Sequence, residues 1–281
     1  MNAKKQKTTT SGQPPHVAWF ANTGAKIQTQ DGKAAVIWEF RHEPDDSVLS
    51  LWAKHFREHY CKDSEIDALR NGTGHSRSEY LTNLIFPDHK KPPGPSIRAG
   101  DFGEILVADY LEFLLKYWVP RTGYAVKAVR NESTKGSDVI GFKTSKKGES
   151  SPSDTLAIFE VKSQFTGSKS LAKLQEAVEG SAKDALRKAE TLNAIKRRLI
   201  QSNRTKEAER VERFQNPPDH PYREVFGAVA VLTTPLYEDS EIKKTKTKHH
   251  PNFKGLELLV IRGESMMELV HLLYKKAALE A

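Results

Sequence analysis

The stretch Gly136-Ser-Asp-Val-Ile-Gly-Phe142, followed after a polar insert by Thr155-Leu-Ala-Ile-Phe-Glu-Val-Lys-Ser-Gln164, predicts two adjacent strands. Asp138 opens the first apolar run, and Glu160-x-Lys162 closes the second. Because side chains alternate across a strand, Glu160 and Lys162 share one face. That face is apolar where the strand begins and polar where it ends. The pattern is typical of a strand that leaves the core at the edge of an active site.

These residue types favour a divalent metal ion held against a phosphodiester. Hard cations such as Mg²⁺ prefer oxygen ligands, usually carboxylates together with water and substrate phosphate. A bound metal ion acidifies a water molecule and neutralises charge on the phosphate. We expect Asp138 and Glu160 to be metal ligands, with the main-chain carbonyl of Val161 completing the shell and Lys162 orienting the attacking water or holding a phosphate oxygen. The expected ion is Mg²⁺, for which Mn²⁺ can substitute.

The Glu-x-Lys triplet is not diagnostic by itself. Glu241-Ile-Lys243 is a second match, in a polar segment with no strand before it. What distinguishes Glu160-x-Lys162 is its context: an apolar strand before it, Asp138 on the neighbouring strand and a long helix after it. The alternative is an edge strand with a surface pair of Glu and Lys.

Glu104 is a further candidate for the same site. It heads the apolar stripe of a helix predicted over about residues 97–118, since apolar residues follow it at i+4, i+7 and i+11. A carboxylate in that position faces the sheet and can serve as a further ligand or as a base. The alternative is structural, because Asp101-Phe-Gly-Glu104 resembles a capping box and an acid suits the first turn of a helix.

The order of these residues resembles the PD-(D/E)xK nuclease superfamily. A helix with a Glu, an Asp and a Glu-x-Lys on adjacent strands, and a further helix follow one another over about residues 97–235. Ser137 stands where the superfamily name has Pro. The resemblance implies an α/β fold with a restriction-endonuclease-like mixed sheet flanked by helices, preceded here by an N-terminal α/β extension.

A narrower resemblance is to the HamA nuclease subunits of the Hachiman antiphage defence system and their AbpA-type relatives. It rests on the Gly103-Glu104 helix start, on the blocks Lys135-Gly-Ser-Asp138 and Phe159-Glu-Val-Lys162, and on the extra N-terminal region. It implies an effector that cuts or degrades DNA when a helicase partner senses phage DNA or damage. The helicase has to be another chain, because no Gly-x4-Gly-Lys-Ser/Thr occurs in this sequence.

The remaining sequence predicts three regions: a basic disordered tail over 1–15, an N-terminal α/β region over 16–95 and a nuclease-like domain over 96–281. The break lies in the Lys-Lys-Pro-Pro-Gly-Pro stretch at 90–95. Further strands are expected near residues 34–40, 124–130, 226–233 and 256–261. Helices are expected near residues 47–60, 64–71, 77–85, 97–118, 170–213 and 265–279, the first capped at residue 45, 46 or 47 and the long one broken near Gly180 or Asn203.

The net charge of +8 and the pI of about 9.3 favour a polyanionic partner, with DNA first among them. Lys183, Arg187 and Lys188 lie early in the helix after Glu160-x-Lys162, where they can contact phosphates. The basic loop 243–250, with Lys244 and Lys246, is either a second backbone contact or simply solvated. Contacts of this kind give affinity without sequence preference.

The sequence also bears on protein classes other than a nuclease. His55-Phe-Arg-Glu58-His59 has the spacing of an inverted zinc peptidase, although His59 continues an apolar stripe on which a packed histidine is the simpler interpretation. No run approaches the roughly 18 apolar residues of a membrane span, and the N-terminus is not a secretion signal, so a cytoplasmic protein is expected. The main alternative function is a non-catalytic DNA-binding or scaffold subunit of a helicase complex.

Overall fold

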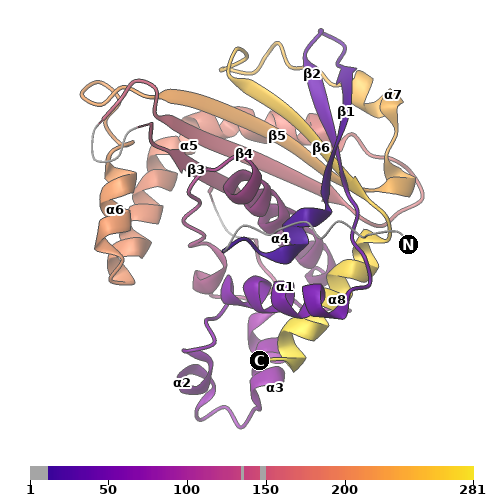
Figure 1. Cartoon of the computed structure of the whole chain (residues 1–281), viewed down its shortest axis with the longest axis vertical. Coiled ribbons are helices and arrows are strands. Elements are labelled where there is room, and N and C mark those ends of the chain that lie inside the picture. Colours follow the sequence, from indigo (N-terminus) through magenta and orange to yellow (C-terminus); the bar gives the residue numbers. More distant parts are fainter. Residues whose placement is uncertain (1–11, 134–135, 146–149) are drawn as a thin grey trace, which may run out of the picture.

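The computed structural model describes residues 12–133, 136–145 and 150–281, and within them the centre of the molecule is one six-stranded sheet of order β1-β2-β6-β5-β4-β3 (Figure 1). The strands are β1 (Phe20–Gln28), β2 (Ala34–Phe40), β3 (Val139–Lys143), β4 (Thr155–Gln164), β5 (Arg223–Thr233) and β6 (Leu256–Gly263). The four inner strands run parallel, and β1 and β3 run antiparallel at the two edges. The predicted mixed α/β sheet is confirmed.

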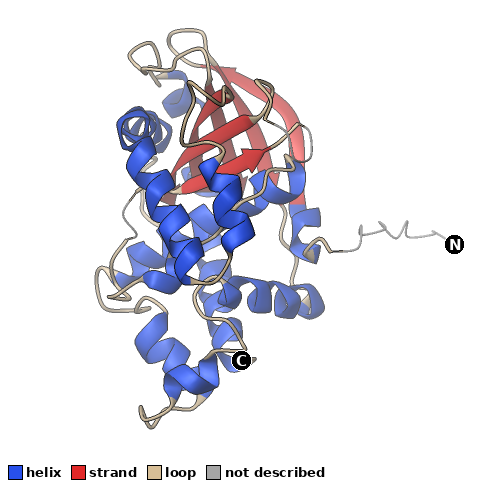
Figure 2. Ribbon diagram, turned by 90° about the vertical axis from the view of Figure 1, so that its left-hand side faces the viewer, coloured by secondary structure: helices blue, strands red, loops and turns tan. Residues whose placement is uncertain are grey.

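Helices cover both faces of this sheet. They are α1 (Asp46–Glu58), α2 (Ile66–Arg70), α3 (Arg77–Tyr80), α4 (Gly94–Asp109), α5 (Lys173–Gln201), α6 (Thr205–Glu212), α7 (Asp239–Lys243) and α8 (Met266–Leu279). The apolar side chains of α5 and α6 form one core with one face of the sheet, and those of α1, α4 and α8 form a second core with the other. Figure 2 shows that the half of the molecule away from the sheet is helical.

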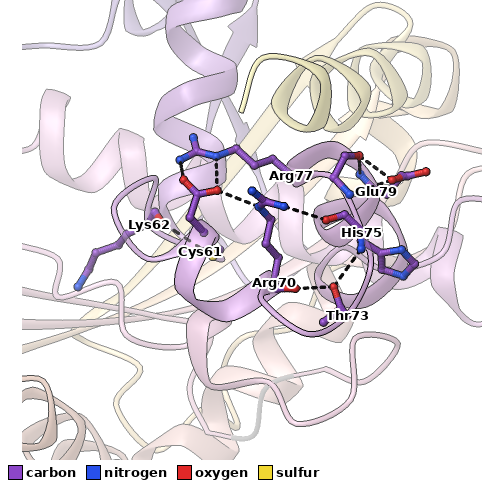
Figure 3. A network of polar contacts seen from close by, with 9 residues as sticks. Cys61, Lys62, Arg70, Thr73, His75, Arg77 and Glu79 are labelled. Atoms are coloured by element: carbon purple, nitrogen blue, oxygen red, sulfur yellow. Dashed lines mark hydrogen bonds and ion pairs between the residues drawn. The ribbon is translucent and has the colours of Figure 1, made fainter.

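Shorter helical turns connect these elements. Turns of 3-10 type occupy Pro15–Trp19, Tyr124–Val126 and Thr234–Leu236, and π turns occupy Leu81–Ile85 and Tyr110–Leu114. The segment between α2 and α3 is held by local polar contacts (Figure 3), in which Arg70 donates to the carbonyl of His75 (3.1 Å) and Thr73 donates to the carbonyl of Arg70 (2.7 Å). These contacts lie far from the sheet in Figure 1 and leave the candidate site to other elements.

The alternation predicted for the central strand is confirmed. Leu156 and Ile158 of β4 pack in the core of α5, whereas Phe159 and Val161 pack in the core of α4 and α8. Glu160 has the parity of Leu156 and Ile158 and therefore lies on the α5 face.

The N-terminal region shares the sheet with the rest of the chain. β2 pairs in parallel with β6, and α1 packs against α8, so hydrogen bonds and core contacts cross the predicted division at residue 95. The division into domains stays a prediction. The helix start in this region is confirmed, because the side chain of Asp45 accepts from the amides of Ser47 and Val48 and caps α1.

Two predictions near the site are wrong. The helix expected to reach Trp118 ends at Leu114, because Trp118 exchanges two main-chain hydrogen bonds with Phe142 of β3. The strand expected over 124–130 is a 3-10 turn followed by irregular chain. No strand forms there because Trp118 already pairs with the outer edge of β3, and because Lys127 forms an ion pair with Asp101 of α4.

Three smaller outcomes complete the comparison with the sequence. The long helix breaks at Asn203, which has φ +57°, and runs without interruption through Gly180. The edge strand β1 was not expected, since its apolar residues alternate too weakly to indicate a strand. No helix of the described chain is long and apolar enough to cross a membrane.

Candidate metal centre and adjoining cavity

A cavity of about 820 Å³ opens beside the ends of β3 and β4. Its walls come from α4, from the loop 119–124, from the residues before β3 and from the middle of α5. Three of the predicted catalytic residues, Glu104, Asp138 and Glu160, line it together although they come from different parts of the chain. Tertiary structure thus places the predicted carboxylates at one site.

Asp138 sits where β3 begins. The last pair in the register of β3 and β4 is Val139 with Phe159, so Asp138 lies beside the part of β4 that has no β3 partner. Its Oδ2 accepts a hydrogen bond from the amide of Val161 (2.8 Å). Because the N–H and C=O of one strand residue point the same way, the carbonyl of Val161 also faces this edge. The carbonyl that is predicted to be a metal ligand therefore lies on the same edge of β4 as Asp138.

Glu160 and Lys162 point to the same side, as their parity predicts. The ammonium of Lys162 is hydrogen-bonded to Glu160 Oε1, and Glu160 is only 6% exposed. Burial opposes the charged form of Lys162, but the charges of Asp138 and Glu160 outweigh it and raise its pKa. Gly180 of α5 makes room for the carboxylate, since a Cβ at this position would lie 2.3 Å from Glu160 Oε1.

Asp184 is a member of the site that was not predicted. It lies one turn after Gly180 on α5 and is fully buried. Its Oδ1 accepts from Ser137 (3.0 Å) and pairs with Arg187 (3.2 Å), whereas its buried Oδ2 has no hydrogen-bond partner. Burial, followed by the charge of Glu160, raises the pKa of Asp184 to about 7. A Gly and an Asp four residues apart, on the helix after Glu160-x-Lys162, were the available sequence signal.

Glu104 approaches from the opposite face of the sheet. Its Oε2 accepts from the hydroxyl of Tyr124 (2.7 Å), and burial followed by the charge of Asp138 raises its pKa well above the ordinary value. Burial and the charge of Glu160 raise the pKa of Asp138 to about 8. The alternative role of Glu104 in a capping box is excluded, because α4 begins at Gly94 and Glu104 lies inside it.

We call Glu104, Asp138, Glu160 and Asp184 the carboxylate cluster. The four carboxyls have two ion-pair partners among the described residues, Lys162 and Arg187, so the carboxyls outnumber their cationic partners. Raised pKa values are the expected consequence when carboxyls share a poorly solvated site. The all-oxygen donor set and the unpartnered Oδ2 of Asp184 fit a hard divalent cation such as Mg²⁺ or Mn²⁺.

The predicted DNA-contacting residues are separated by the fold. Arg187 lines the cavity. Lys188 instead pairs with Glu224 of β5, and Lys244 pairs with Glu241, three residues before it. Lys183 and Lys246 are exposed and are not among the cavity residues. Two arginines that were not predicted, Arg121 and Arg198, do line the cavity.

The histidines of the peptidase-like motif belong to a second cluster, the Asp109 hub, made of His16, His55, His59, Asp109 and Arg121. Asp109 binds His16 (2.8 Å), His55 (2.9 Å) and Arg121 (2.7 Å), and Arg121 also binds His59 Nε2 (2.9 Å). Donor atoms of the two motif histidines and Asp109 lie within 4.8 Å of one another, but Arg121 already bonds two of the three residues. The motif's Glu58 turns away to accept from the amide of Asp63 (3.0 Å). The arrangement favours packed, structural histidines.

Comparison with known proteins gives one family. The family model described as HamA matches residues 15–277. The match begins in the first 3-10 turn and ends in α8, so it includes the N-terminal region, the Asp109 hub and the carboxylate cluster. No curated protein matches the chain.

Proposed function

Because this chain belongs to the HamA family, a family of the Hachiman antiphage defence system, we propose that it is the metal-dependent DNA nuclease of that system. Its helicase partner would be a separate chain, and its core would be a member of the PD-(D/E)xK superfamily. The observation that carries the proposal is the carboxylate cluster: Glu104, Asp138 and Glu160 line one cavity, Asp184 lies behind it on α5, and only Lys162 and Arg187 pair with these carboxyls among the described residues. Such an excess of carboxyls over cationic partners is typical of a site that takes up metal ions.

Asp138, Glu160 and the carbonyl of Val161 are the residues that would hold the cation. When bound, Mg²⁺ would supply a more acidic water and neutralise charge on the phosphate. Both carboxylates are already oriented, Asp138 by the amide of Val161 and Glu160 by Gly180 and Lys162. This pre-organisation limits the reordering that binding requires.

Lys162 and Glu104 are proposed to act on the reacting groups. Lys162 stays charged, because Asp138 and Glu160 raise its pKa, and its ammonium can donate to the attacking water or to a phosphate oxygen. Glu104 is held by the hydroxyl of Tyr124, and burial followed by the charge of Asp138 raises its pKa well above the ordinary value, so it can carry a proton as a general acid. The proposal is supported by the position of Glu104 and Glu160 in one cavity and by the pairing of Lys162 with Glu160.

DNA contacts are proposed to begin at Arg187, which lines the cavity beside Asp184. Lys183, Lys188, Lys244 and Lys246 would add contacts to the phosphate backbone outside the cavity, and Lys188 and Lys244 would first have to leave their glutamate partners. Contacts of this type position DNA without reading its sequence.

The experiment compares Glu160→Ala and Lys162→Ala with Glu241→Ala and Lys243→Ala, the second Glu-x-Lys in the chain. Each variant is purified, combined with the helicase partner, ATP, Mg²⁺ and labelled DNA, and assayed for cleavage. We expect the first pair to lose at least roughly 100-fold in rate, as loss of a general acid–base group does, and the control pair to keep wild-type activity. Cleavage unchanged by both substitutions would contradict the proposal. Salt-sensitive DNA binding without cleavage under any metal would support the non-catalytic alternative.

A further inference from the structure

One face of α5 forms a long wall of the cavity. Arg187, Thr191, Ala194, Ile195 and Arg198 all line it, at the i, i+4, i+7, i+8 and i+11 spacing of a single helical face. The two arginines are eleven residues apart, which is three helical turns or about 16 Å along the axis. The first lies beside the carboxylate cluster, because it pairs with Asp184.

Both arginines have binding capacity that the protein does not use. Arg198 is half-buried and has no acidic partner among the described residues, and burial followed by the charge of Arg197 lowers its pKa. Arg187 has a partner in Asp184, but its Nε is buried without a hydrogen bond. A partly desolvated guanidinium lacking an anion is unfavourable, and its planar fork of donors matches a phosphate. The third arginine of the cavity, Arg121, is already committed to Asp109 and Glu112.

We propose that the cavity takes a single DNA strand, with one phosphate at Arg187 beside the carboxylate cluster and another at Arg198 further along α5. This proposal rests on the proposed function and adds the substrate class and the path of the strand. The roughly 16 Å between the arginines is a length that a few nucleotides of one strand bridge. The lining side chains between them are Glu190, Thr191, Ala194 and Ile195, and the Thr191 hydroxyl already donates to the carbonyl of Arg187 (3.1 Å). The proposed contacts are therefore to phosphates, which position a strand without reading its sequence.

The dimensions of the cavity favour one strand over a duplex. Its volume of about 820 Å³ is that of a pocket for one small ligand, which typically measures roughly 300–1,000 Å³. Glu160 lines it and is only 6% exposed. A phosphate can reach this carboxylate only after its nucleotide leaves the duplex, which costs a few kcal/mol, as in enzymes that extrude a base. A strand separated beforehand avoids this cost.

The test measures binding to the full-length protein with Ca²⁺ in place of Mg²⁺, so that binding can be followed without cleavage. The probes are a fluorescent oligothymidine and a blunt duplex of equal length. The variants are Arg198→Ala and, as a matched control, Arg197→Ala, which removes the same charge from the exposed side of the same helix. We expect Arg198→Ala to weaken single-strand binding at least tenfold and to reduce the salt slope by about 0.7, the value for one phosphate of a single strand. Arg197→Ala should change affinity less than twofold.

Several results decide the proposal. Equal affinity of the wild type for duplex and single strand, or equal effects of the two substitutions, would overturn it. Arg198→Lys should restore the salt slope and only part of the affinity, since lysine lacks the bidentate fork, and it serves as the test if Arg198→Ala does not fold. The wild type is assayed in parallel for cleavage with the helicase partner, ATP and Mg²⁺. If the wild type cleaves DNA but Arg198→Ala does not weaken single-strand binding, the strand path is refuted and the nuclease is not. If Arg198→Ala weakens binding but the wild type does not cleave, the nuclease is refuted and the strand path is supported.

Discussion

The carboxylate cluster and the Asp109 hub are two groups of charged side chains that differ in charge balance. In the hub, one buried carboxylate receives Arg121, His16 and His55, and despite its burial these partners hold its pKa well below the ordinary value. In the carboxylate cluster, burial and neighbouring negative charges raise the pKa values of Glu104, Asp138 and Asp184. The hub is complete without a ligand. The carboxylate cluster has fewer cationic partners than carboxyls among the described residues, and this difference separates a structural site from a candidate functional one.

The two clusters meet in the loop 119–124. Arg121 of this loop forms an ion pair with Asp109 of the hub. Tyr124, three residues later, donates a hydrogen bond to Glu104 of the carboxylate cluster. The loop also forms part of the cavity wall. The hub therefore fixes one wall of the site, and it connects that wall to the N-terminal region through His16. A charge-balanced cluster is suited to this role because it resists rearrangement when a ligand binds next to it.

The largest expected effect is the loss of Asp109. Asp109→Ala removes the buried carboxylate that His16, His55 and Arg121 share and leaves Arg121 with Glu112 as its one acidic partner among the described residues, and removing one partner of a buried ion pair costs about 3–5 kcal/mol. Urea unfolding of the metal-free protein measures this loss. A decrease below about 1 kcal/mol would show that the hub is not the structural site described here.

Metal binding should stabilise the carboxylate cluster and not the hub. At a concentration of Mn²⁺ or Mg²⁺ about 100 times the dissociation constant, we expect the free energy of unfolding to rise by roughly 2.7 kcal/mol. Asp138→Asn should remove most of this gain while Glu241→Gln keeps it, because only the first substitution changes a proposed ligand. Thermal unfolding with and without the ion gives both numbers. A gain that survives Asp138→Asn but is lost in His55→Gln would assign the ion to the hub.

Acid should weaken the hub. Burial lowers the pKa values of His16 and His59, so below about pH 6.5 the unfolded chain binds protons that the folded chain does not. The contribution of the hub to stability then falls as pH falls, by roughly 1–2 kcal/mol between pH 7.5 and 5.5, whereas the raised pKa values of Asp138 and Asp184 act in the opposite direction in this range. His250 and His271 have lowered pKa values as well, so the contribution of the hub has to be isolated with a variant.

His59→Gln isolates that contribution. A glutamine carbonyl can still accept from Arg121, as His59 Nε2 does, but it takes up no proton in this range. The variant should lose less stability on acidification than the wild type, whereas the exposed His249→Gln should match the wild type. Identical pH profiles of stability for all three proteins would show that protonation of His59 does not contribute to the loss of stability in acid.

The parts of the site that the sequence predicted are those set by local pattern. The parity of Glu160 and Lys162 and the position of Asp138 at a strand start follow from residues close in the chain. Asp184 and Arg198 were missed because their roles depend on which face of α5 packs on β4. Residues 124–130 were mistaken for a strand because nothing local indicates that Trp118 already pairs with β3. The hub was missed for the same reason, since its members come from residues 16 to 121.

The smallest change in stability is expected for a substitution at Gly180. The same substitution should nevertheless reduce cleavage. A methyl group there would lie 2.3–2.6 Å from three atoms of the Glu160 side chain, which must move away, whereas replacing glycine inside a helix stabilises by about 0.5–1 kcal/mol. We expect Gly180→Ala to change the free energy of unfolding by less than about 1 kcal/mol and to reduce cleavage strongly. Gly100→Ala is the control, because it lies inside α4 with open space around its Cα and should gain stability and keep activity. If the two variants cleave DNA equally well, then the position of Glu160 that α5 enforces is not needed for the reaction, and the carboxylate cluster loses its distinction from the hub.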